Sequence, residues 1–401
     1  MLAATVRVTR DLDAAEEAVQ DAYVQALRTW SRDGVPDRPG AWLTTVARRL
    51  ALNGMRRGRT LEAKLPLLLD PDEASPPEDA LDLEPDVIPD DRLRLVFTCC
   101  HPALAVEAQV ALTLRLVCGV ETRDVAHAFL VSPATMAARI TRAKKKIVAA
   151  RIPYVVPGPA DLPGRVDAVS TVIHLLYTTG HTAPAGEDLV REDLCARALD
   201  LARMLVALLP GDTEAAGLLA LLHMHEARRP TRVDARGGLI RLEDQDRGRW
   251  DRALIAEADA LIVAALSAPG AVPGRFLLQA AIAALHAQAP SVEATDWPQV
   301  VALYDALLRV WPSDVVRLNR AVAVAMVDGP AAGLAEVEAL ERAGRLAGYR
   351  YLASTRADLL RRLGRHAEAA DAYREALRLT DNAAERAFLE GRLQPAPPTD
   401  V

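Results

Sequence analysis

Cysteines and long apolar runs, which signal secretion or membrane insertion, are scarce in this chain. Its 401 residues include only four cysteines. It has neither a recognisable signal peptide nor an apolar run long enough to cross a bilayer. We therefore expect a reducing, cytoplasmic setting and no contact with a membrane.

The sequence also lacks recognisable catalytic and metal-binding motifs. The chain shows no nucleophile–base set and no phosphate-binding loop, so we expect no enzymatic activity and no cofactor. Cys99, Cys100 and His101 form a possible metal motif, but no second ligand pair lies near them, and a packed segment at a helix start is the simpler interpretation. His223 and His225 would face different sides of a helix, which favours structural roles.

What the chain does contain is alanine, leucine and arginine in abundance, with only 4% aromatic residues. This composition predicts an all-α protein, and the length suffices for two or three domains. The net charge of −6 hides a strong local asymmetry. Residues 41–59 and 125–151 contain no acid, whereas residues 65–91 contain no base. Local charge is therefore the better guide to binding partners.

Residues 121–147 show the pattern of a helix-turn-helix. Ser132 and Pro133 predict a helix start, because serine caps free N–H groups and proline is tolerated in the first helical turn. A shorter helix with Val125, Ala126 and Phe129 on one side precedes it. The second helix has an apolar face and a basic face, as follows. The apolar face comprises Met136, Ile140, Ala143 and Ile147, and the other face comprises Thr135, Ala138, Arg139, Arg142, Lys145 and Lys146. Lys144, together with Lys145 and Lys146, would add phosphate affinity.

Such a basic helix suits the major groove of DNA, where phosphates attract the cations and side chains read base edges. A solvated cationic helix end, stabilised by the helix dipole, is the alternative that the pattern leaves open.

Two further helices precede this motif. Residues 11–30 predict an amphipathic helix whose inner face comprises Ala15, Val19, Ala22, Tyr23, Ala26, Leu27 and Trp30. Its outer face carries an acidic patch made of Glu16, Glu17, Gln20 and Asp21. A second helix, residues 41–59, carries Arg48, Arg49, Arg56, Arg57 and Arg59. For both helices, a merely solvated face is the default alternative.

Together these stretches resemble the extracytoplasmic-function (ECF) sigma factors. AAEEAVQDAY (14–23) is similar to the helix with which that family binds core RNA polymerase, and WLTTVARRLALNGMRR (42–57) is similar to its promoter-melting helix. The helix-turn-helix at 121–147 resembles the domain that reads the minus-thirty-five promoter element. Three motifs in this order are more specific than any one of them.

The resemblance implies a role for each group of residues. Glu16, Glu17, Gln20 and Asp21 would bind core polymerase. The minus-ten strand would be held by Trp42, Arg48, Arg49, Asn53, Arg56 and Arg57, since an aromatic platform and cations suit single-stranded bases. The minus-thirty-five element would be read by Thr135, Ala138, Arg139, Arg142, Lys145 and Lys146.

The resemblance also predicts the domain order. Residues 1–62 would form sigma domain 2, lacking about twenty to thirty residues at its start relative to the usual domain size. Residues 63–91 would be an acidic linker, either a polyanion mimic or a flexible tether. Residues 92–152 would form sigma domain 4, with Leu112, Leu114, Leu116 and Val117 in its core and Gly119 after a helix end. FTCCHPALA (97–105) resembles a signature of the subgroup with a large C-terminal extension.

Residues 160–395 would be that extension. Pro210 and Pro312 end similar stretches 102 residues apart, three times 34, and a 34-residue period predicts a tetratricopeptide-like α-solenoid. Its clearest copy, residues 351–379, predicts two helices around Gly364. Residues 237–255 break the repeat with a dense cluster of acids and arginines. We interpret the cluster as mutually neutralising charges in a hinge or contact surface, rather than as catalytic carboxylates.

These observations predict an RNA polymerase sigma factor that directs promoter-specific initiation. We further expect its extension to replace a separate anti-sigma factor by masking or positioning the sigma domains. A one-component helix-turn-helix regulator with a sensing domain is the main alternative, but it leaves residues 11–57 unexplained. A tetratricopeptide scaffold leaves the two acid-free helices unexplained, and an enzyme has the least support.

Overall fold

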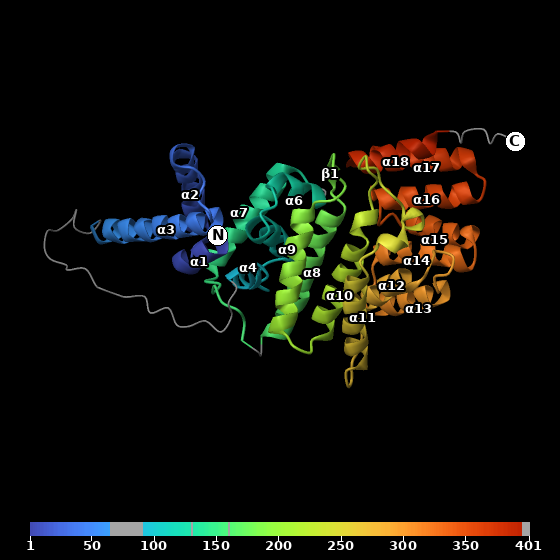
Figure 1. Ribbon diagram of the computed structural model, residues 1–401, viewed down its shortest axis with the longest axis horizontal. Helices are drawn as coiled ribbons and strands as arrows, with labels where there is room; N and C mark the ends of the chain where they lie inside the picture. The colour runs from blue at the N-terminus through green and yellow to red at the C-terminus, as the bar shows by residue number, and fades with distance from the viewer. Residues whose placement is uncertain (65–90, 130, 159–160, 395–401) are drawn as a thin grey trace. The chain divides into compact units, whose positions relative to one another are not determined.

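The computed structural model describes residues 1–64, 91–129, 131–158 and 161–394, and these are almost entirely α-helical (Figure 1). The prediction of an all-α protein is confirmed. Contacts divide the chain into two units, Met1–Val172 and Ile173–Val401. The boundary falls within helix α8 (Leu162–His181). Residues 65–90, most of the predicted acidic linker, lie outside the described ranges.

The first unit begins with α1 (Leu2–Thr9), α2 (Leu12–Asp33) and α3 (Pro39–Lys64). Asp11 starts α2 by accepting a hydrogen bond from the backbone N–H of Ala14 at 2.9 Å. A stripe of small residues on α2 is buried: Ala15, Ala18, Ala22 and Ala26. Because alanine is small, this stripe lets α2 approach α3 closely, and Ala22 and Ala26 pack against Leu43, Val46 and Ala47.

The predicted inner face of α2 was too wide. Tyr23 is 51% exposed and Leu27 is 77% exposed, so both point to solvent instead of the core. The alanine stripe by itself forms the contact of α2 with α3. No described helix covers the neighbouring face of α2, which carries Tyr23 and Leu27. The prediction was right for Ala15, Ala22 and Ala26.

The remaining helices of the first unit follow in chain order. They are α4 (Asp91–Cys99), α5 (Val106–Leu112), a π-helical turn (Thr113–Val117), α6 (Thr122–Ala128) and α7 (Pro133–Ala149). The π-helical turn contacts α1, α4, α5 and α6, which explains why the alternating Leu112, Leu114 and Leu116 are all buried. Val117 is half-buried, and Gly119 follows with a positive φ of 69°.

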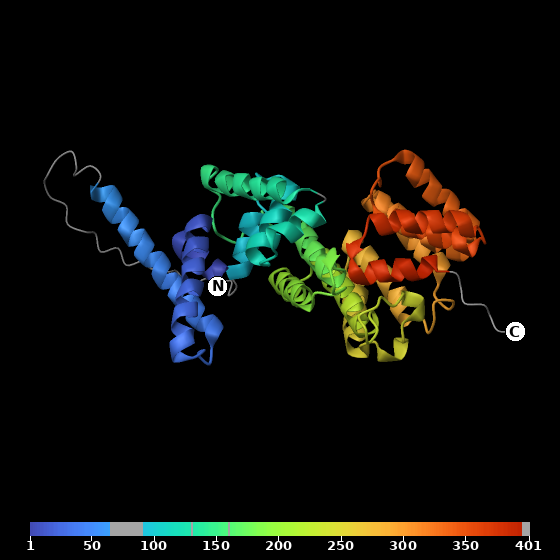
Figure 2. The ribbon, with the colours of Figure 1, turned by 90° about the horizontal axis from the view of Figure 1, so that it is seen from above.

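The second unit continues from the end of α8 as a succession of helices with two short strands. They are β1 (Ala185–Gly186), α9 (Glu192–Leu208), α10 (Thr213–Ala227), α11 (Arg252–Ser267), α12 (Arg275–Gln288), α13 (Trp297–Val310), α14 (Asp314–Val327), α15 (Pro330–Ala343), α16 (Arg350–Arg362), α17 (His366–Arg378), β2 (Asp381–Asn382) and α18 (Ala383–Leu393). From α12 onward each helix packs against the next in the chain (Figures 1 and 2). The expected helix pair around Gly364 is present as α16 and α17, with Gly364 at a φ of +74°.

Close packing of α10 on α12 begins this array. A Cβ on Gly217 would lie 2.6 Å from the Cα of Leu277, so only glycine fits there. At the start of α10, the Glu214 carboxylate accepts hydrogen bonds from the backbone N–H groups of Phe276 (3.0 Å) and Leu277 (3.2 Å). This carboxylate therefore caps α12, where the helix dipole favours a negative charge.

The two ends of the second unit are tied together, which the repeat pattern did not predict. β1 and β2 pair in parallel, with Gly186 opposite Asn382. The buried Asn382 donates a hydrogen bond from Nδ2 to the carbonyl of Asp188 at 2.9 Å. Its Oδ1 also caps α18 by accepting from the N–H of Ala384 at 3.0 Å.

Residues 230–251, which we name the crossing segment, span from α10 to α11. Arg232 donates to the carbonyl of His181 and to Oγ1 of Thr182 (3.0 Å), at the end of α8. Arg247 donates to the carbonyl of Ala289 at 2.7 Å, just beyond the end of α12. These arginines stabilise helix ends, where unpaired carbonyls and the dipole favour a cation.

The prediction that the charges of this segment neutralise one another was therefore mostly wrong. Arg241 and Glu243 do pair at 2.5 Å. Asp251, however, caps α11 by accepting from the N–H of Ala253 at 2.9 Å. Trp250, only 3% exposed, anchors the segment, since its Nε1 donates to Oγ1 of Thr231 at 2.9 Å.

Candidate nucleic-acid interface

Helix α7 has the two faces that its sequence predicts. Ser132 caps it, since its Oγ accepts a hydrogen bond from the N–H of Thr135 at 3.2 Å. The predicted apolar face is buried in the first unit, and it comprises Met136, Ile140, Ala143 and Ile147. The opposite face is open, with Thr135, Ala138, Arg142, Lys145 and Lys146 exposed and Arg139 half-exposed.

The cations on the open face make few interactions with the rest of the protein. The Arg139 guanidinium lies 5.6 Å from the ring centre of Phe129, and Arg142 donates only to the carbonyl of Ala138 within its own helix. Among the described residues, no carboxylate pairs with Arg139, Arg142, Lys145 or Lys146. Arginines that are exposed, positioned and unneutralised are the usual ligands of phosphates and guanine edges.

Lys144 behaves differently from its neighbours on α7. Its Nζ contacts the Glu16 carboxylate and lies 2.9 Å from Oδ1 of Asp13, both at the start of α2. Burial alone would lower the pKa of this ammonium, but the two carboxylates raise the pKa above its ordinary value. Arg115 lies 3.9 Å from the same Glu16 carboxylate. The helix predicted to read DNA thus contacts the helix predicted to bind polymerase.

A tyrosine reinforces this packing within the first unit. The hydroxyl of Tyr154 lies 2.8 Å from the carbonyl of Ala3 and 2.8 Å from that of Asp91. Arg7 on α1 lies 3.7 Å from the Asp91 carboxylate at the start of α4. These contacts join the first helices of the unit to the later ones.

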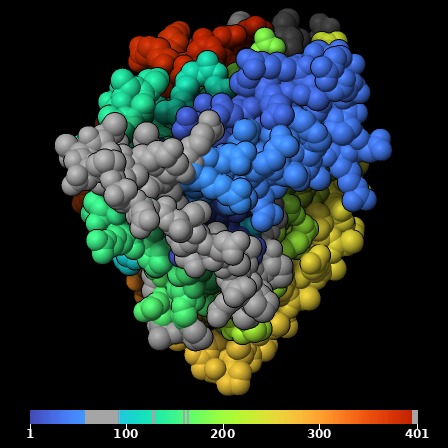
Figure 3. All heavy atoms as spheres, turned by 90° about the vertical axis from the view of Figure 1, so that its left-hand side faces the viewer, coloured from blue at the N-terminus to red at the C-terminus, as the bar shows by residue number. Residues whose placement is uncertain are grey.

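The outer surface of α2 is both acidic and apolar. Of the predicted patch, Glu17, Gln20 and Asp21 are exposed, whereas Glu16 is turned to Lys144 and is partly buried. Beside them lie three exposed apolar side chains: Tyr23 (51%), Val24 (44%) and Leu27 (77%). Figure 3 shows the N-terminal helices, in blue, at the surface of the first unit.

Sequence reasoning missed this apolar part of the α2 surface. The signal was present, because the alanines at 15, 18, 22 and 26 already form a complete stripe at three- and four-residue spacing. This stripe is wide enough to pack against α3 without Tyr23 and Leu27. Large apolar side chains grouped on an exposed helix face indicate a surface for another protein.

Helix α3 presents the second basic surface. Arg48, Arg49, Asn53 and Arg56 are exposed along it. Trp42 was expected to offer an exposed ring on which a base could stack. Instead, it is half-buried, and its ring packs on Trp30 with the ring centres 5.4 Å apart. The side chain of Arg57 lies outside the described residues.

The cysteine motif is part of the core. Cys99 ends α4 and Cys100 follows it, so the motif lies at a helix end and not at a helix start as predicted. All four cysteines are buried. Burial raises the pKa of the Cys100 thiol to about 12, which disfavours the reactive thiolate. In the part of the chain that the structure describes, no three His, Cys, Asp or Glu side chains gather to hold a metal ion, and no helix is long and apolar enough to cross a membrane.

Comparison with known proteins identifies these helices. Residues 2–60 match Sigma-70 region 2, and residues 94–147 match Sigma-70, region 4. The chain belongs to the sigma-70 family, whose members bind core RNA polymerase and promoter DNA and direct promoter-specific transcription. Residues 165–266 match a family of unknown function (DUF6596). Within the sigma-70 family, this chain is an ECF-like sigma factor with a large C-terminal extension.

One relative matches almost the whole chain. An uncharacterized protein of Rhizobium meliloti (strain 1021) is 45% identical over 395 residues, which cover 98% of this chain and 92% of that protein. No solved structure matches the chain.

Proposed function

We propose a division of labour among three helix faces of the first unit. The open face of α7, following α6 in a helix-turn-helix, reads the minus-thirty-five element. The exposed face of α3 holds the minus-ten strand, and the exposed face of α2 docks on core polymerase. The observation that carries this proposal is α7 itself, where one face is buried and the other presents cations that no described carboxylate neutralises.

On α7, Arg139 and Arg142 would contact base edges, and Lys145 and Lys146 would contact phosphates. On α3, Arg48, Arg49 and Arg56 would follow the strand backbone, and Asn53 would contact a base. Trp42 would need to leave Trp30 to stack on a base, so we assign it a supporting role.

On α2, Glu17, Gln20 and Asp21 would supply the polar contacts with polymerase. Tyr23, Val24 and Leu27 would supply the apolar ones, which become favourable when the two proteins exclude water. The mixed character of this face is typical of a protein–protein interface, with an apolar centre and a polar rim.

Promoter binding requires that Lys144 separate from Asp13 and Glu16. The minus-ten and minus-thirty-five elements are about 25 base pairs apart, or about 85 Å along the duplex. A helix bound at one element cannot also contact, at 2.9 Å, a helix next to the other. We therefore propose that the packing of α7 against α2 is a resting arrangement that polymerase opens.

The extension would regulate this opening and would make a separate anti-sigma factor unnecessary. Support for the proposal comes from its size and from its successive helix pairs, which suit a tetratricopeptide-like array. Asn382→Ala tests it, because the change removes the tie to Asp188 and the cap of α18 while leaving the first unit untouched. We expect altered promoter-specific transcription. Unchanged transcription from a variant whose extension melts earlier would contradict the proposal.

Reconstituted transcription tests the assignment of α7. Core polymerase and this chain, as the sole sigma factor, would transcribe a pool of genomic promoter fragments. Losing one base contact costs about 1–3 kcal/mol, so Arg142→Ala should reduce promoter-specific transcripts roughly 5- to 150-fold. Arg374→Ala, which removes an exposed arginine of α17, is the matched control and should have no effect.

Two results would count against the proposal. Arg142→Ala could transcribe as well as the wild type, which would remove the role of α7. Alternatively, the wild-type chain could bind DNA alone and yet support no transcription with core polymerase, which would favour an operator-binding regulator.

A further inference from the structure

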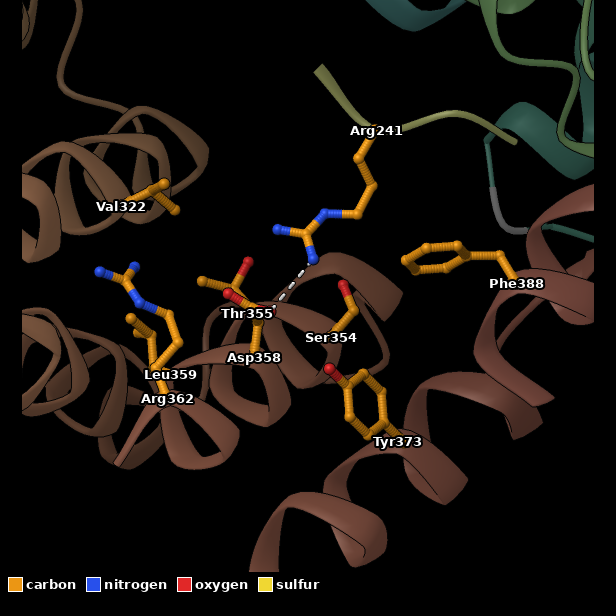
Figure 4. A pocket seen from close by; sticks show the side chains of 9 residues that line it. All are labelled: Arg241, Val322, Ser354, Thr355, Asp358, Leu359, Arg362, Tyr373 and Phe388. Carbon is orange, nitrogen blue, oxygen red and sulfur yellow. Dashed lines mark ion pairs between the residues drawn. The ribbon is translucent and has the colours of Figure 1, made fainter. Parts of the chain in front are cut away.

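The second unit contains a pocket of about 240 Å³ that the sigma-factor activity does not use (Figure 4). It lies among the crossing segment, α14, α16, α17 and α18. Its lining comprises Arg241, Val322, Ser354, Thr355, Asp358, Leu359, Arg362, Tyr373 and Phe388. Pockets for drug-sized molecules measure about 300–1,000 Å³, so this one suits a smaller ligand.

Two opposite charges face each other across the pocket. Arg241 extends from the crossing segment toward Asp358 on α16, and its Nη1 lies 3.5 Å from Oδ1 of Asp358 (Figure 4). Close ion pairs between guanidinium and carboxylate have N···O distances of about 2.7–2.9 Å. The pair across the pocket is therefore loose, whereas the Arg241–Glu243 contact is close, at 2.5 Å.

Each charge also retains capacity for a ligand. Oδ1 of Asp358 is held by Arg361 at 2.8 Å, but within the described ranges no side chain or backbone group donates to its Oδ2. Arg362, the second cation of the lining, is exposed and uses one nitrogen on the carbonyl of Ala325 at 3.3 Å. A guanidinium has five N–H donors, so both arginines can bind a carboxylate without losing these contacts.

The rest of the lining combines hydroxyls with an apolar surface. Ser354 and Thr355 bring hydroxyl groups from α16, and the hydroxyl of Tyr373 points toward the same space (Figure 4). Phe388 and Val322 stand on two sides of it, and Val322 is 38% exposed. The exposed valine on one side and the half-buried phenylalanine on the other leave apolar area that a ligand side chain could cover.

We propose that this pocket binds a free L-α-amino acid with an apolar or aromatic side chain. The ligand carboxylate binds Arg241 and Arg362, its ammonium binds Oδ2 of Asp358, and its side chain packs on Phe388 and Val322. A plain anion is disfavoured, because Asp358 lies between the two arginines and would repel it. A plain cation is disfavoured by those arginines, so a zwitterion matches the lining best.

Ligand binding would be transmitted through the crossing segment. Arg241 belongs to the same short segment as Arg232 and Arg247, which hold the ends of α8 and α12. A ligand that fixes Arg241 therefore stabilises a segment that holds the ends of these two helices. Binding can be measured without polymerase, so the failure of this inference is distinguishable from the failure of the proposed function.

Titration calorimetry on the full chain tests the inference. The probes are L-valine, L-leucine, L-isoleucine, L-methionine and L-phenylalanine, and we expect at least one to bind at a single site. Arg241→Gln, which removes the guanidinium charge, and Asp358→Asn, which removes the carboxylate charge at constant size, should each weaken that binding at least tenfold. Arg374→Ala is the matched control on α17, and its affinity should equal that of the wild type.

Blocked derivatives of the bound amino acid separate a zwitterion site from other sites. The methyl ester lacks the carboxylate and the N-acetyl derivative lacks the ammonium, so both should bind at least tenfold more weakly. The inference is overturned if none of the five probes binds, or if Arg241→Gln and Asp358→Asn bind as the wild type does. It is also overturned if either derivative binds as tightly as its parent. Circular dichroism melting of each variant verifies that it remains folded.

Discussion

Arginines on the open helix faces of the first unit and arginines of the helix ends in the second unit serve opposite purposes in this sigma factor. In the first unit, Arg48, Arg49 and Arg142 are exposed, and no carboxylate in the described part of the chain neutralises them. In the second unit, Arg232 and Arg247 bind carbonyls at helix ends, and Arg320 bridges Asp305 and Glu336. The residue type is the same, and only its partners differ.

This difference teaches how to interpret an arginine-rich chain with a negative net charge. An arginine whose donors are satisfied within its own unit contributes to stability, and its charge is not available to a ligand. An arginine held on a helix face without a carboxylate remains available to a polyanion. The comparison predicts that arginine substitutions will have separable effects: loss of Arg232 or Arg247 should lower stability, and loss of Arg142 should lower transcription.

Acid should destabilise the second unit much more than the first. Burial, together with the nearby Arg275, lowers the pKa of His174 to about 4, and burial, together with Arg228 and Arg247, lowers the pKa of His286 to about 4. Their unfolded pKa is about 6.5, so between pH 6.5 and 4 the unfolded chain binds protons that the folded chain does not. The free energy of unfolding should therefore decrease as the pH is lowered from 6.5 to 4, by about 3 kcal/mol for each histidine.

Calorimetric melting of the full chain from pH 7 to pH 4 measures this loss. His286→Gln cannot gain the proton, so its melting temperature should depend less steeply on pH than that of the wild type. Identical slopes for the two proteins would show that His286 does not contribute.

Arg232→Ala should destabilise the second unit by about 3 kcal/mol, because hydrogen bonds to a charged group contribute about 1.5–3 kcal/mol each. Arg232 is only 8% exposed, and its loss leaves the carbonyl at the end of α8 without a partner. Arg142→Ala on α7 is the contrasting control, expected to change stability by less than about 0.5 kcal/mol. Urea unfolding followed by circular dichroism compares them, and equal effects would refute the distinction between the units.

Lys144→Ala should strengthen binding to core polymerase by up to about fivefold, since partly exposed ion pairs contribute about 0–1 kcal/mol. The change removes the contacts of α7 with Asp13 and Glu16 that must break on the promoter. Lys145→Ala, one residue further along, is the matched control and should leave polymerase affinity unchanged. Equilibrium binding of labelled chain to core polymerase decides between them. Weaker binding by Lys144→Ala would contradict the proposal that the packing of α7 against α2 is a resting arrangement that polymerase opens.

Local signals in the sequence predicted the helices well. Ser132 and Pro133 marked the start of α7, and the four apolar residues of its buried face followed from spacing alone. The pair α16 and α17 around Gly364 was equally visible. These features depend on neighbouring residues, whose preferences and periodicity a single sequence displays.

Features that depend on distant contacts could not be predicted. The exposure of Tyr23 and Leu27 depends on which face of α2 another helix covers. The Lys144–Glu16 contact joins residues far apart in the chain, and the pairing of β1 with β2 likewise joins the two ends of the second unit. The arginines of the crossing segment were misinterpreted for the same reason, because their partners are carbonyls of helices remote in sequence.

Native co-purification with core RNA polymerase tests the central claim most directly, namely that α2 is the docking helix. The test variant is Glu17→Arg combined with Asp21→Arg. The matched control is Glu368→Arg combined with Asp371→Arg, which reverses two exposed acids on α17 of the second unit. The account predicts that the wild type and the control co-purify with polymerase and that the α2 variant does not. Retention of the α2 variant at the wild-type level would contradict it.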